Sequence, residues 1–86
     1  MNDADRNEPA GRKVAVLVAA EGIEQVELTG PWEALESAGW SPELISPEAG
    51  EVQAYNHLER ADTFTVGRTV ADAEVDDYAA LLLPGG

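Results

Sequence analysis

Three carboxylates follow the first apolar run of the chain, where an enzyme could carry out acid–base chemistry. They belong to Glu21, Glu24 and Glu27, and the apolar run before them covers residues 13–20 (KVAVLVAA). A glutamate between a strand and a helix can accept a proton, or it can hold a nucleophile through a hydrogen bond. It can equally be an acid that the macrodipole favours at a helix start. The spacing alone leaves both interpretations open.

A pair of glycines is the second candidate for chemistry. Gly85 and Gly86 follow Pro84 and the apolar run 79–83 (AALLL). Because glycine has no side chain, such a pair lets the backbone turn sharply and present bare N–H groups. Backbone N–H groups of this kind can stabilise an oxyanion. A simple tight turn out of a strand would use the same residues.

The usual signatures of a nucleotide or metal site are absent from the sequence. Neither GxGxxG nor GxxxxGK[ST] occurs, and there is no cysteine, so no Gly-rich phosphate cradle, disulfide or Cys-based metal site can form. His57 is the only histidine, and we interpret it as a surface side chain with no clear carboxylate partner. We expect Trp32 and Trp40 to pack in the core rather than form a stacking platform. The sequence therefore predicts neither a cofactor nor a metal ion.

The charge balance restricts the class of partner. Seventeen acidic residues against five basic ones give a formal net charge of −12, which would repel nucleic acid and disfavour anionic lipid. Residues 1–6 are neither apolar nor positively charged overall, unlike a signal peptide. The apolar run 14–20 is far shorter than the roughly 20 residues that span a bilayer. We expect a cytoplasmic chain that binds neither nucleic acid nor membrane.

The first elements are predicted from hydrophobic periodicity. The polar residues 1–11 indicate a disordered tail, and the apolar, non-alternating run 13–20 is typical of a strand covered on both faces. Residues 24–39 are predicted to be helical, with Gly39 as the stop. The apolar residues at helical spacing are Leu28, Trp32, Leu35 and Ala38. Pro31 interrupts this pattern, so either a fresh helix starts there or the helix kinks.

The remaining elements complete a β-α-β order with a β excursion. The predicted strands are 40–46, then 52–55 and 63–66 as a small antiparallel excursion, and finally 79–83. A turn is expected at 47–50 and a short helix or turn at 70–77. This order predicts an α/β fold, the opening half of a doubly wound sandwich with a mainly parallel sheet. Only one convincing helix is available to cover the buried strands.

Three segments taken together resemble the ThiJ/PfpI family, within the class I glutamine amidotransferase-like fold. They are KVAVLVAAEGIEQVEL, PWEALESAGW and YAALLLPGG, and segments 55–57, 62–64 and 68–70 look closest to the bacterial PfpI-type branch. The resemblance implies a flavodoxin-like sandwich. It also implies that residues 12–86 are the N-terminal half of such a domain, ending before the turn that carries the nucleophile.

The resemblance also implies roles for the two candidates. Glu24 matches the family's glutamate that hydrogen-bonds the catalytic cysteine and shuttles its proton. Gly85 and Gly86 match the pair whose N–H groups help form the oxyanion site. The family's cysteine and its neighbouring histidine lie downstream and are absent here, and His57 cannot take that histidine's place. An acidic residue is also expected near Gly67, and none is found in the stretch before Arg68.

Two hypotheses about function follow. Full-length relatives are described as Cys-dependent peptidase-like or glyoxalase- and deglycase-like stress enzymes that often form oligomers, so this chain would be a truncated member without a nucleophile, inactive alone. Alternatively, it is a non-enzymatic interaction module that docks on a partner or self-associates through its uncovered sheet. The expected partner is a second copy of the chain or a complementing C-terminal half.

Overall fold

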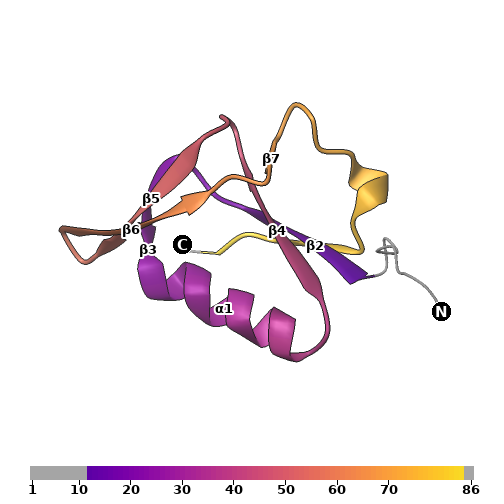
Figure 1. Cartoon of the computed structure of the whole chain (residues 1–86), viewed down its shortest axis with the longest axis horizontal. Coiled ribbons are helices and arrows are strands. Elements are labelled where there is room, and N and C mark those ends of the chain that lie inside the picture. The colour runs from indigo at the N-terminus through magenta and orange to yellow at the C-terminus, as the bar shows by residue number, and fades with distance from the viewer. Residues whose placement is uncertain (1–11, 85–86) are drawn as a thin grey trace.

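The computed structural model describes residues 12–84 (Figure 1). The predicted tail 1–11 and the glycine pair Gly85 and Gly86 lie outside the described residues. The elements in chain order are β2 (Lys13–Leu17), β3 (Glu21–Glu24), α1 (Gln25–Ser37), β4 (Ser41–Ser46), β5 (Glu51–Asn56), β6 (Glu59–Thr65), β7 (Arg68–Thr69), the 3₁₀ helix η2 (Val75–Asp77) and β8 (Ala80–Leu82).

The main sheet has four strands in the order β7-β4-β2-β8, all of them parallel. Val16 of β2 pairs with Leu44 of β4 on one side and with Leu82 of β8 on the other. The β-branched run in β2 suits this central position, where a strand is flanked on both edges and faces apolar layers. The predicted mainly parallel α/β fold is confirmed.

The first predicted strand is shorter than expected, and a separate strand follows it. β2 ends at Leu17, and the chain then leaves the main sheet to form β3. This strand pairs in parallel with β5 in a second sheet of order β3-β5-β6. Gly22 has a φ of 110°, and the register shifts between Glu21 and Ile23. Non-local pairing with β5 explains why the segment EGIE, assigned partly to a loop by its sequence, forms a strand.

Helix α1 is continuous through Pro31, so no fresh helix starts at that position. Proline has no N–H, which removes one hydrogen bond of the helical ladder. Packing of the apolar face offsets this loss, because Leu28 is buried and Trp32 and Leu35 contact the core. The helix ends where predicted, with Gly39 at a φ of 91°. Within residues 12–84, no helix is long and apolar enough to cross a membrane.

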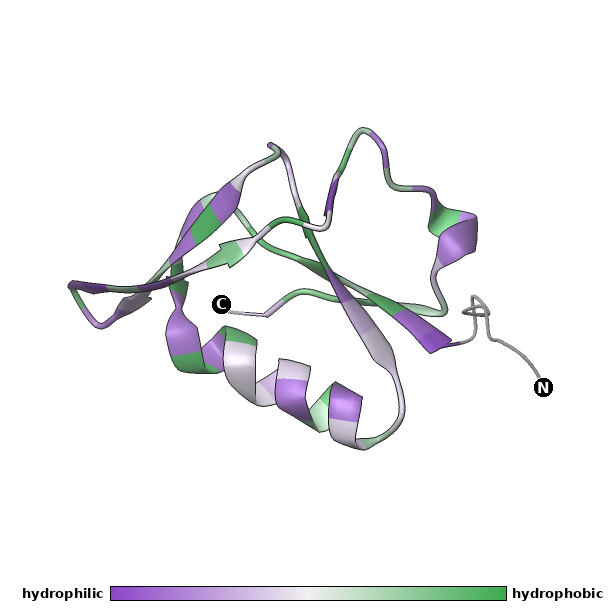
Figure 2. Cartoon of the chain, viewed as in Figure 1, coloured by the Kyte–Doolittle hydropathy of each residue, from purple (hydrophilic) through white to green (hydrophobic). Residues whose placement is uncertain are grey.

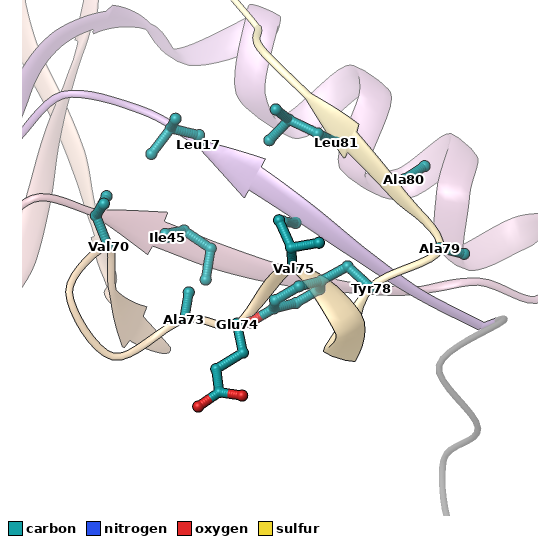
Figure 3. Close-up of a pocket in the computed structure, with 11 residues that line it drawn as sticks. Leu17, Ile45, Val70, Ala73, Glu74, Val75, Tyr78, Ala79, Ala80 and Leu81 are labelled. Carbon is teal, nitrogen blue, oxygen red and sulfur yellow. The ribbon is translucent and has the colours of Figure 1, made fainter.

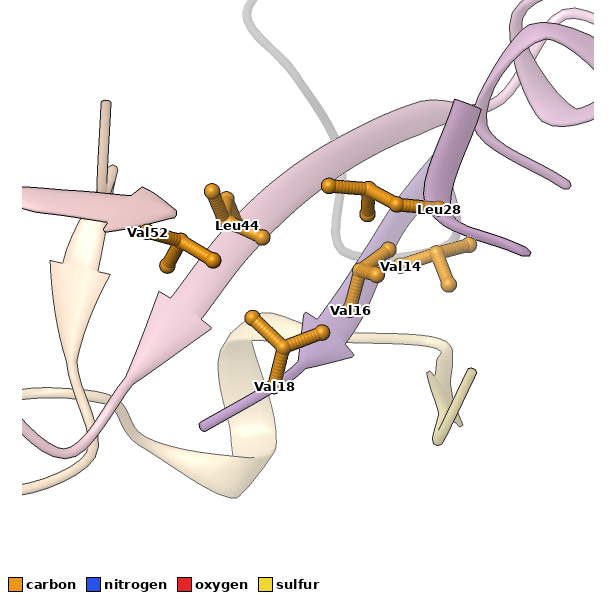
Figure 4. Close-up of a cluster of buried hydrophobic side chains, with 6 residues drawn as sticks. All are labelled: Val14, Val16, Val18, Leu28, Leu44 and Val52. Carbon is orange, nitrogen blue, oxygen red and sulfur yellow. The ribbon is translucent and has the colours of Figure 1, made fainter. Parts of the chain in front are cut away.

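The hydrophobic core lies between α1 and one face of the main sheet and extends to the second sheet (Figure 4). Its buried members are Val14, Val16, Val18, Leu28, Leu44 and Val52. Trp32 packs against this core as predicted, whereas Trp40 remains 39% exposed. Trp40 follows the helix end, and its backbone N–H donates to the Leu35 carbonyl, which places it at the margin of the helix rather than beneath it.

The alternating side chains of the strands give the main sheet a second apolar face. In β2, Val14 and Val16 point into the core, so Ala15 and Leu17 point the other way. The strands β2 and β8 are coloured mainly as hydrophobic in Figure 2. Helix α1 lies on only one side of the sheet, as Figure 1 shows. The face away from α1 is therefore apolar and has no helix of α1's length across it in the described chain.

Candidate functional site

Glu24 lies at the junction between β3 and α1, at the edge of the main sheet where its parallel strands end. It is the last residue of β3 and the N-cap residue of α1. The helix connects two parallel strands, β2 and β4, so it must start near their carboxyl ends. Open α/β sheets bind ligands at this edge. The predicted candidate is thus positioned by two elements where chemistry is expected.

The Glu24 side chain does not cap its own helix. No side-chain capping hydrogen bond is formed at the start of α1. The carboxylate instead accepts from the backbone N–H of His57, at 3.0 Å to Oε2 and 3.2 Å to Oε1. His57 is exposed, as predicted. The prediction concerned the His57 side chain, whereas this bond uses the backbone N–H and joins residues 33 positions apart, which sequence spacing does not indicate.

Two more contacts join the same junction to the hairpin formed by β5 and β6. The Tyr55 hydroxyl donates to Glu21 Oε2 at 3.2 Å. Gln25 Nε2 donates to Asp62 Oδ2 at 3.0 Å, and the Asp62 backbone N–H donates to Gln25 Oε1 at 2.8 Å. Sequence reasoning missed these partners. The only indication in the sequence analysis was that segments 55–57 and 62–64 resemble the family.

The three candidate carboxylates have different surroundings in the structure. Glu21 and Glu24 bond different parts of the hairpin. Glu27 lies in the first turn of α1 and is exposed. Among residues 12–84, no group of three or more His, Cys, Asp or Glu side chains could hold a metal ion. The described part of the junction is therefore arranged around single carboxylates rather than a metal-binding cluster.

The predicted oxyanion donors Gly85 and Gly86 are outside the described residues, so their contacts stay a prediction. The strand that leads to them is described: β8 pairs in parallel with β2, with Val16 opposite Leu82. The carboxyl end of β8 therefore lies at the same edge of the sheet as the carboxyl end of β2. Helix α1 begins at this edge, and Glu24 lies there as its N-cap residue.

The structure gives a steric reason for the glycine at position 67, in the stretch where an acidic residue was expected. A Cβ at Gly67 would lie 2.9 Å from Glu43 Cγ and 3.3 Å from the Leu44 carbonyl oxygen. The Gly67 N–H also donates to that carbonyl at 2.8 Å. A side chain at this position would thus collide with β4. The acidic group nearest to this position is Glu43 itself, which forms an ion pair with Arg68 at 3.9 Å.

Glu43 is the centre of a charged cluster near one end of the sheet. It accepts from the Tyr78 hydroxyl and pairs with Lys13 at 3.7 Å. Lys13 also lies over the Tyr78 ring, and Arg68 bonds Asp77 at 3.3 Å. Burial, followed by the Glu43 hydrogen bond, raises the pKa of Tyr78 to about 12. The cluster fastens the segment after β7 to β2 and β4.

A hollow of about 400 Å³ lies on the sheet face away from α1 (Figure 3). Its floor comes from β2, β4 and β8, and its wall comes from the segment that contains η2. The side chains drawn in Figure 3 are mostly apolar, with Tyr78 at one side. Leu81 is 60% exposed and Val75 is 88% exposed. Apolar side chains are thus exposed around the hollow on this face of the sheet.

The match to a known protein family covers almost the whole chain. The model of the DJ-1/PfpI family matches residues 12–86. The chain belongs to the DJ-1/PfpI family. This confirms the resemblance to the ThiJ/PfpI family that the sequence segments carried.

Several curated relatives of the chain are staphylococcal proteins described as uncharacterized. One from Staphylococcus epidermidis is 44% identical over 75 residues, covering 87% of this chain and 41% of that protein. Another from Staphylococcus haemolyticus is 40% identical over the same length, with 41% of that protein covered. A Staphylococcus aureus relative is 40% identical, with 42% covered. The chain thus spans about two fifths of the length of these relatives.

A solved structure shares the fold. The crystal structure of a ThiJ/PfpI domain protein from Brachyspira murdochii matches with a TM-score of 0.75 and covers 92% of this chain and 43% of that chain. Sequence identity is 15%, so this likeness concerns the fold alone. It confirms the predicted family fold, an α/β arrangement with a mainly parallel sheet.

Proposed function

We propose that this chain supplies the carboxylate and oxyanion part of a DJ-1/PfpI-type cysteine site. Glu24 is the proton acceptor, and the backbone N–H groups of Gly85 and Gly86 are the oxyanion donors. The nucleophile comes from protein outside these 86 residues, because the sequence has no cysteine. The chain alone is therefore inactive, and a complementing C-terminal half completes the site.

The reaction class is attack of a thiol on a carbonyl group. The sulfur forms a bond to the carbonyl carbon, the carbonyl oxygen takes the electron pair, and the thiol proton passes to the Glu24 carboxylate. The immediate product is a tetrahedral oxyanion; from an aldehyde it becomes a thiohemiacetal when Glu24 returns the proton to that oxygen, and an amide or ester gives the corresponding tetrahedral adduct. The glycine N–H groups would stabilise the developing oxyanion. Substrates of this kind suit the glyoxalase-like and peptidase-like activities that the family resemblance implies.

One observation supports this proposal above the others. The Glu24 carboxylate makes no cap on α1 and is held away from it by the hairpin, at the carboxyl edge of the parallel strands. An acid that only neutralised the helix start would need no such contact. A carboxylate fixed in one orientation at this edge is suited to accept a proton from a nearby nucleophile.

The test joins the chain to the rest of a relative. Residues 12–86 would replace the matching segment of the Staphylococcus epidermidis protein, which is 44% identical over 75 residues. Turnover of a small dicarbonyl and of a peptide substrate is then measured for this chimera. We expect Glu24→Gln to lower kcat by about 10²–10⁴-fold and Glu27→Gln to leave it unchanged. Equal activity in the Glu24→Gln chimera, or an inactive unmodified chimera, would contradict the proposal.

The apolar face of the main sheet favours a second candidate function, that of an interaction module. We propose that the remaining part of a DJ-1/PfpI domain covers this face, because residues such as Leu81 are exposed there and large exposed apolar patches usually mark interfaces. Leu81→Glu should weaken association with the C-terminal segment of the relative at least tenfold. Leu58→Glu is the control, since Leu58 is 96% exposed at the hairpin tip. Equal binding by both variants would exclude this face.

A further inference from the structure

The hairpin formed by β5 and β6 reaches Glu24 through a turn with an uncommon backbone conformation. The strands are antiparallel, and Asn56 pairs with Glu59, so His57 and Leu58 form a two-residue loop. His57 has a φ of 59° and is the only non-glycine residue in the described chain with a positive φ. Two-residue hairpin loops with this feature at the first position prefer glycine. A larger residue there indicates that surrounding contacts hold the backbone.

The contact that holds the turn is the one to Glu24. The His57 N–H lies within hydrogen-bond distance of both carboxylate oxygens, at 3.0 Å and 3.2 Å. An N–H that donates to a carboxylate forms a stronger and more directional bond than one between neutral groups. The donor is a backbone group on a short loop between paired strands, so it restricts the position of the carboxylate more than a flexible side chain would.

Two neighbouring contacts fix the backbone on either side of Glu24. Before it, Glu21 accepts from the Tyr55 hydroxyl. After it, Gln25 and Asp62 form a reciprocal pair through two hydrogen bonds. The Glu24 main chain is thus tied to the hairpin at both ends, and the His57 N–H adds the third point at the carboxylate itself.

We infer that His57 is a positioning residue for Glu24, acting through its backbone N–H in the left-handed conformation. This inference rests on the proposed function of Glu24. A proton acceptor works only if its oxygen is aligned with the group that loses the proton, and small misplacements cost large factors in rate. One donor shared between both oxygens restrains rotation of the carboxylate and leaves their other lone pairs for the nucleophile.

The first test is an NMR titration of the full 86-residue chain. The His57 amide proton is followed together with the Glu24 carboxyl carbon as the pH is lowered. We expect the amide resonance to move upfield with the same midpoint as the Glu24 carbon, because protonation removes the charge that polarises the N–H. In Glu24→Gln this movement should vanish. Any remaining shift would report the nearby groups Glu21, Glu27 and Asp62, and a His57 amide that ignores the Glu24 titration overturns the inference.

The second test uses the chimera and two changes at one position. His57→Gly keeps the N–H and accepts a positive φ, so kcat should be retained. His57→Pro removes the N–H and cannot adopt the positive φ, so kcat should fall about 10²-fold with KM unchanged. Equal kcat values for both variants would overturn the inference. If His57→Pro does not fold, the titration of the unmodified chain still decides the question.

The two tests separate this inference from the proposed function. If Glu24→Gln leaves turnover intact, the function of Glu24 is wrong even where the amide titration shows the contact. If Glu24→Gln abolishes turnover but the His57 amide does not follow the carboxylate, Glu24 acts in catalysis and His57 does not position it. Leu58→Ala is a matched control, because it changes the other residue of the two-residue loop, whose side chain is 96% exposed, and leaves the His57 N–H in place.

Discussion

The Tyr78 hydroxyl donates a hydrogen bond to the Glu43 carboxylate, which lies 35 residues earlier in the chain. This bond connects the segment that follows η2 to the second strand of the main sheet. Burial of the phenol, followed by this hydrogen bond, raises the pKa of Tyr78 to about 12. Because the folded protein keeps Tyr78 neutral to a higher pH than the unfolded chain does, this contact affects the free energy of unfolding at high pH.

We predict that the free energy of unfolding falls as the pH rises from about 10 to about 12. The folded state raises the pKa of Tyr78 to about 12, whereas in the unfolded chain the phenol ionises near its ordinary pKa of 10.0. Stability from this group is therefore present below pH 10 and is lost as the pH passes through the folded pKa. Urea unfolding at a series of pH values measures the effect. Tyr78→Phe should flatten the curve in this window, and an unchanged slope would contradict the prediction.

Gly67→Ala is predicted to destabilise the protein. Its Cβ would lie 2.9 Å from Glu43 Cγ and 3.3 Å from a backbone carbonyl, and overpacking of this kind costs about 1–3 kcal/mol. Gly30→Ala is the matched control, because Gly30 lies in α1 with nothing within 4 Å of the added Cβ. The gain of about 0.5–1 kcal/mol from replacing a helical glycine is opposed there by contact between the new Cβ and the Pro31 ring, so we expect a smaller change than at Gly67. The denaturant midpoint of Gly67→Ala should therefore fall further than that of Gly30→Ala.

Ser46→Ala is predicted to cost about 1–3 kcal/mol. Ser46 is fully buried, and its hydroxyl donates to the Val18 carbonyl at 2.9 Å. Removing the donor leaves a buried carbonyl with one partner fewer. The control is Ser37→Ala at the exposed end of α1, which should change stability by less than about 0.5 kcal/mol. Similar unfolding curves for both variants would mean that the Ser46 bond contributes nothing.

Leu28→Ala is predicted to destabilise the fold by about 2–5 kcal/mol. Leu28 is 2% exposed and is the residue through which α1 enters the core of the main sheet. Leu58→Ala removes the same atoms from a side chain that is 96% exposed, so its effect should be close to zero. Thermal or urea unfolding compares the pair. A small loss for Leu28→Ala would show that the helix can detach without unfolding the sheet.

The order of the main elements could be predicted because their signals are local. The β-branched run of β2, the helical spacing of Leu28, Trp32 and Leu35, and the stop at Gly39 each lie within a few residues. Such patterns depend on the backbone period and on burial, which a short stretch of sequence already contains. The carboxylates Glu21, Glu24 and Glu27 are visible after the first apolar run for the same reason, and the resemblance of the segment EGIEQVEL to the family singled out Glu24 among them.

Other features needed the folded chain. β3 forms only because β5, about thirty residues later, offers it a partner, and α1 continues through Pro31 because core packing outweighs a lost hydrogen bond. The bond between Glu24 and His57, the steric need for Gly67 and the Tyr78 contact all join residues far apart in sequence.

The sequence by itself determined the α/β class through local periodicity, and the family through the resemblance of three segments, which also singled out Glu24 as the candidate carboxylate. Only the tertiary structure decided which groups meet that carboxylate and which sheet face stays open. The physical reason is that hydrogen bonds and packing between distant segments are set by how the whole chain folds, and no local pattern encodes them.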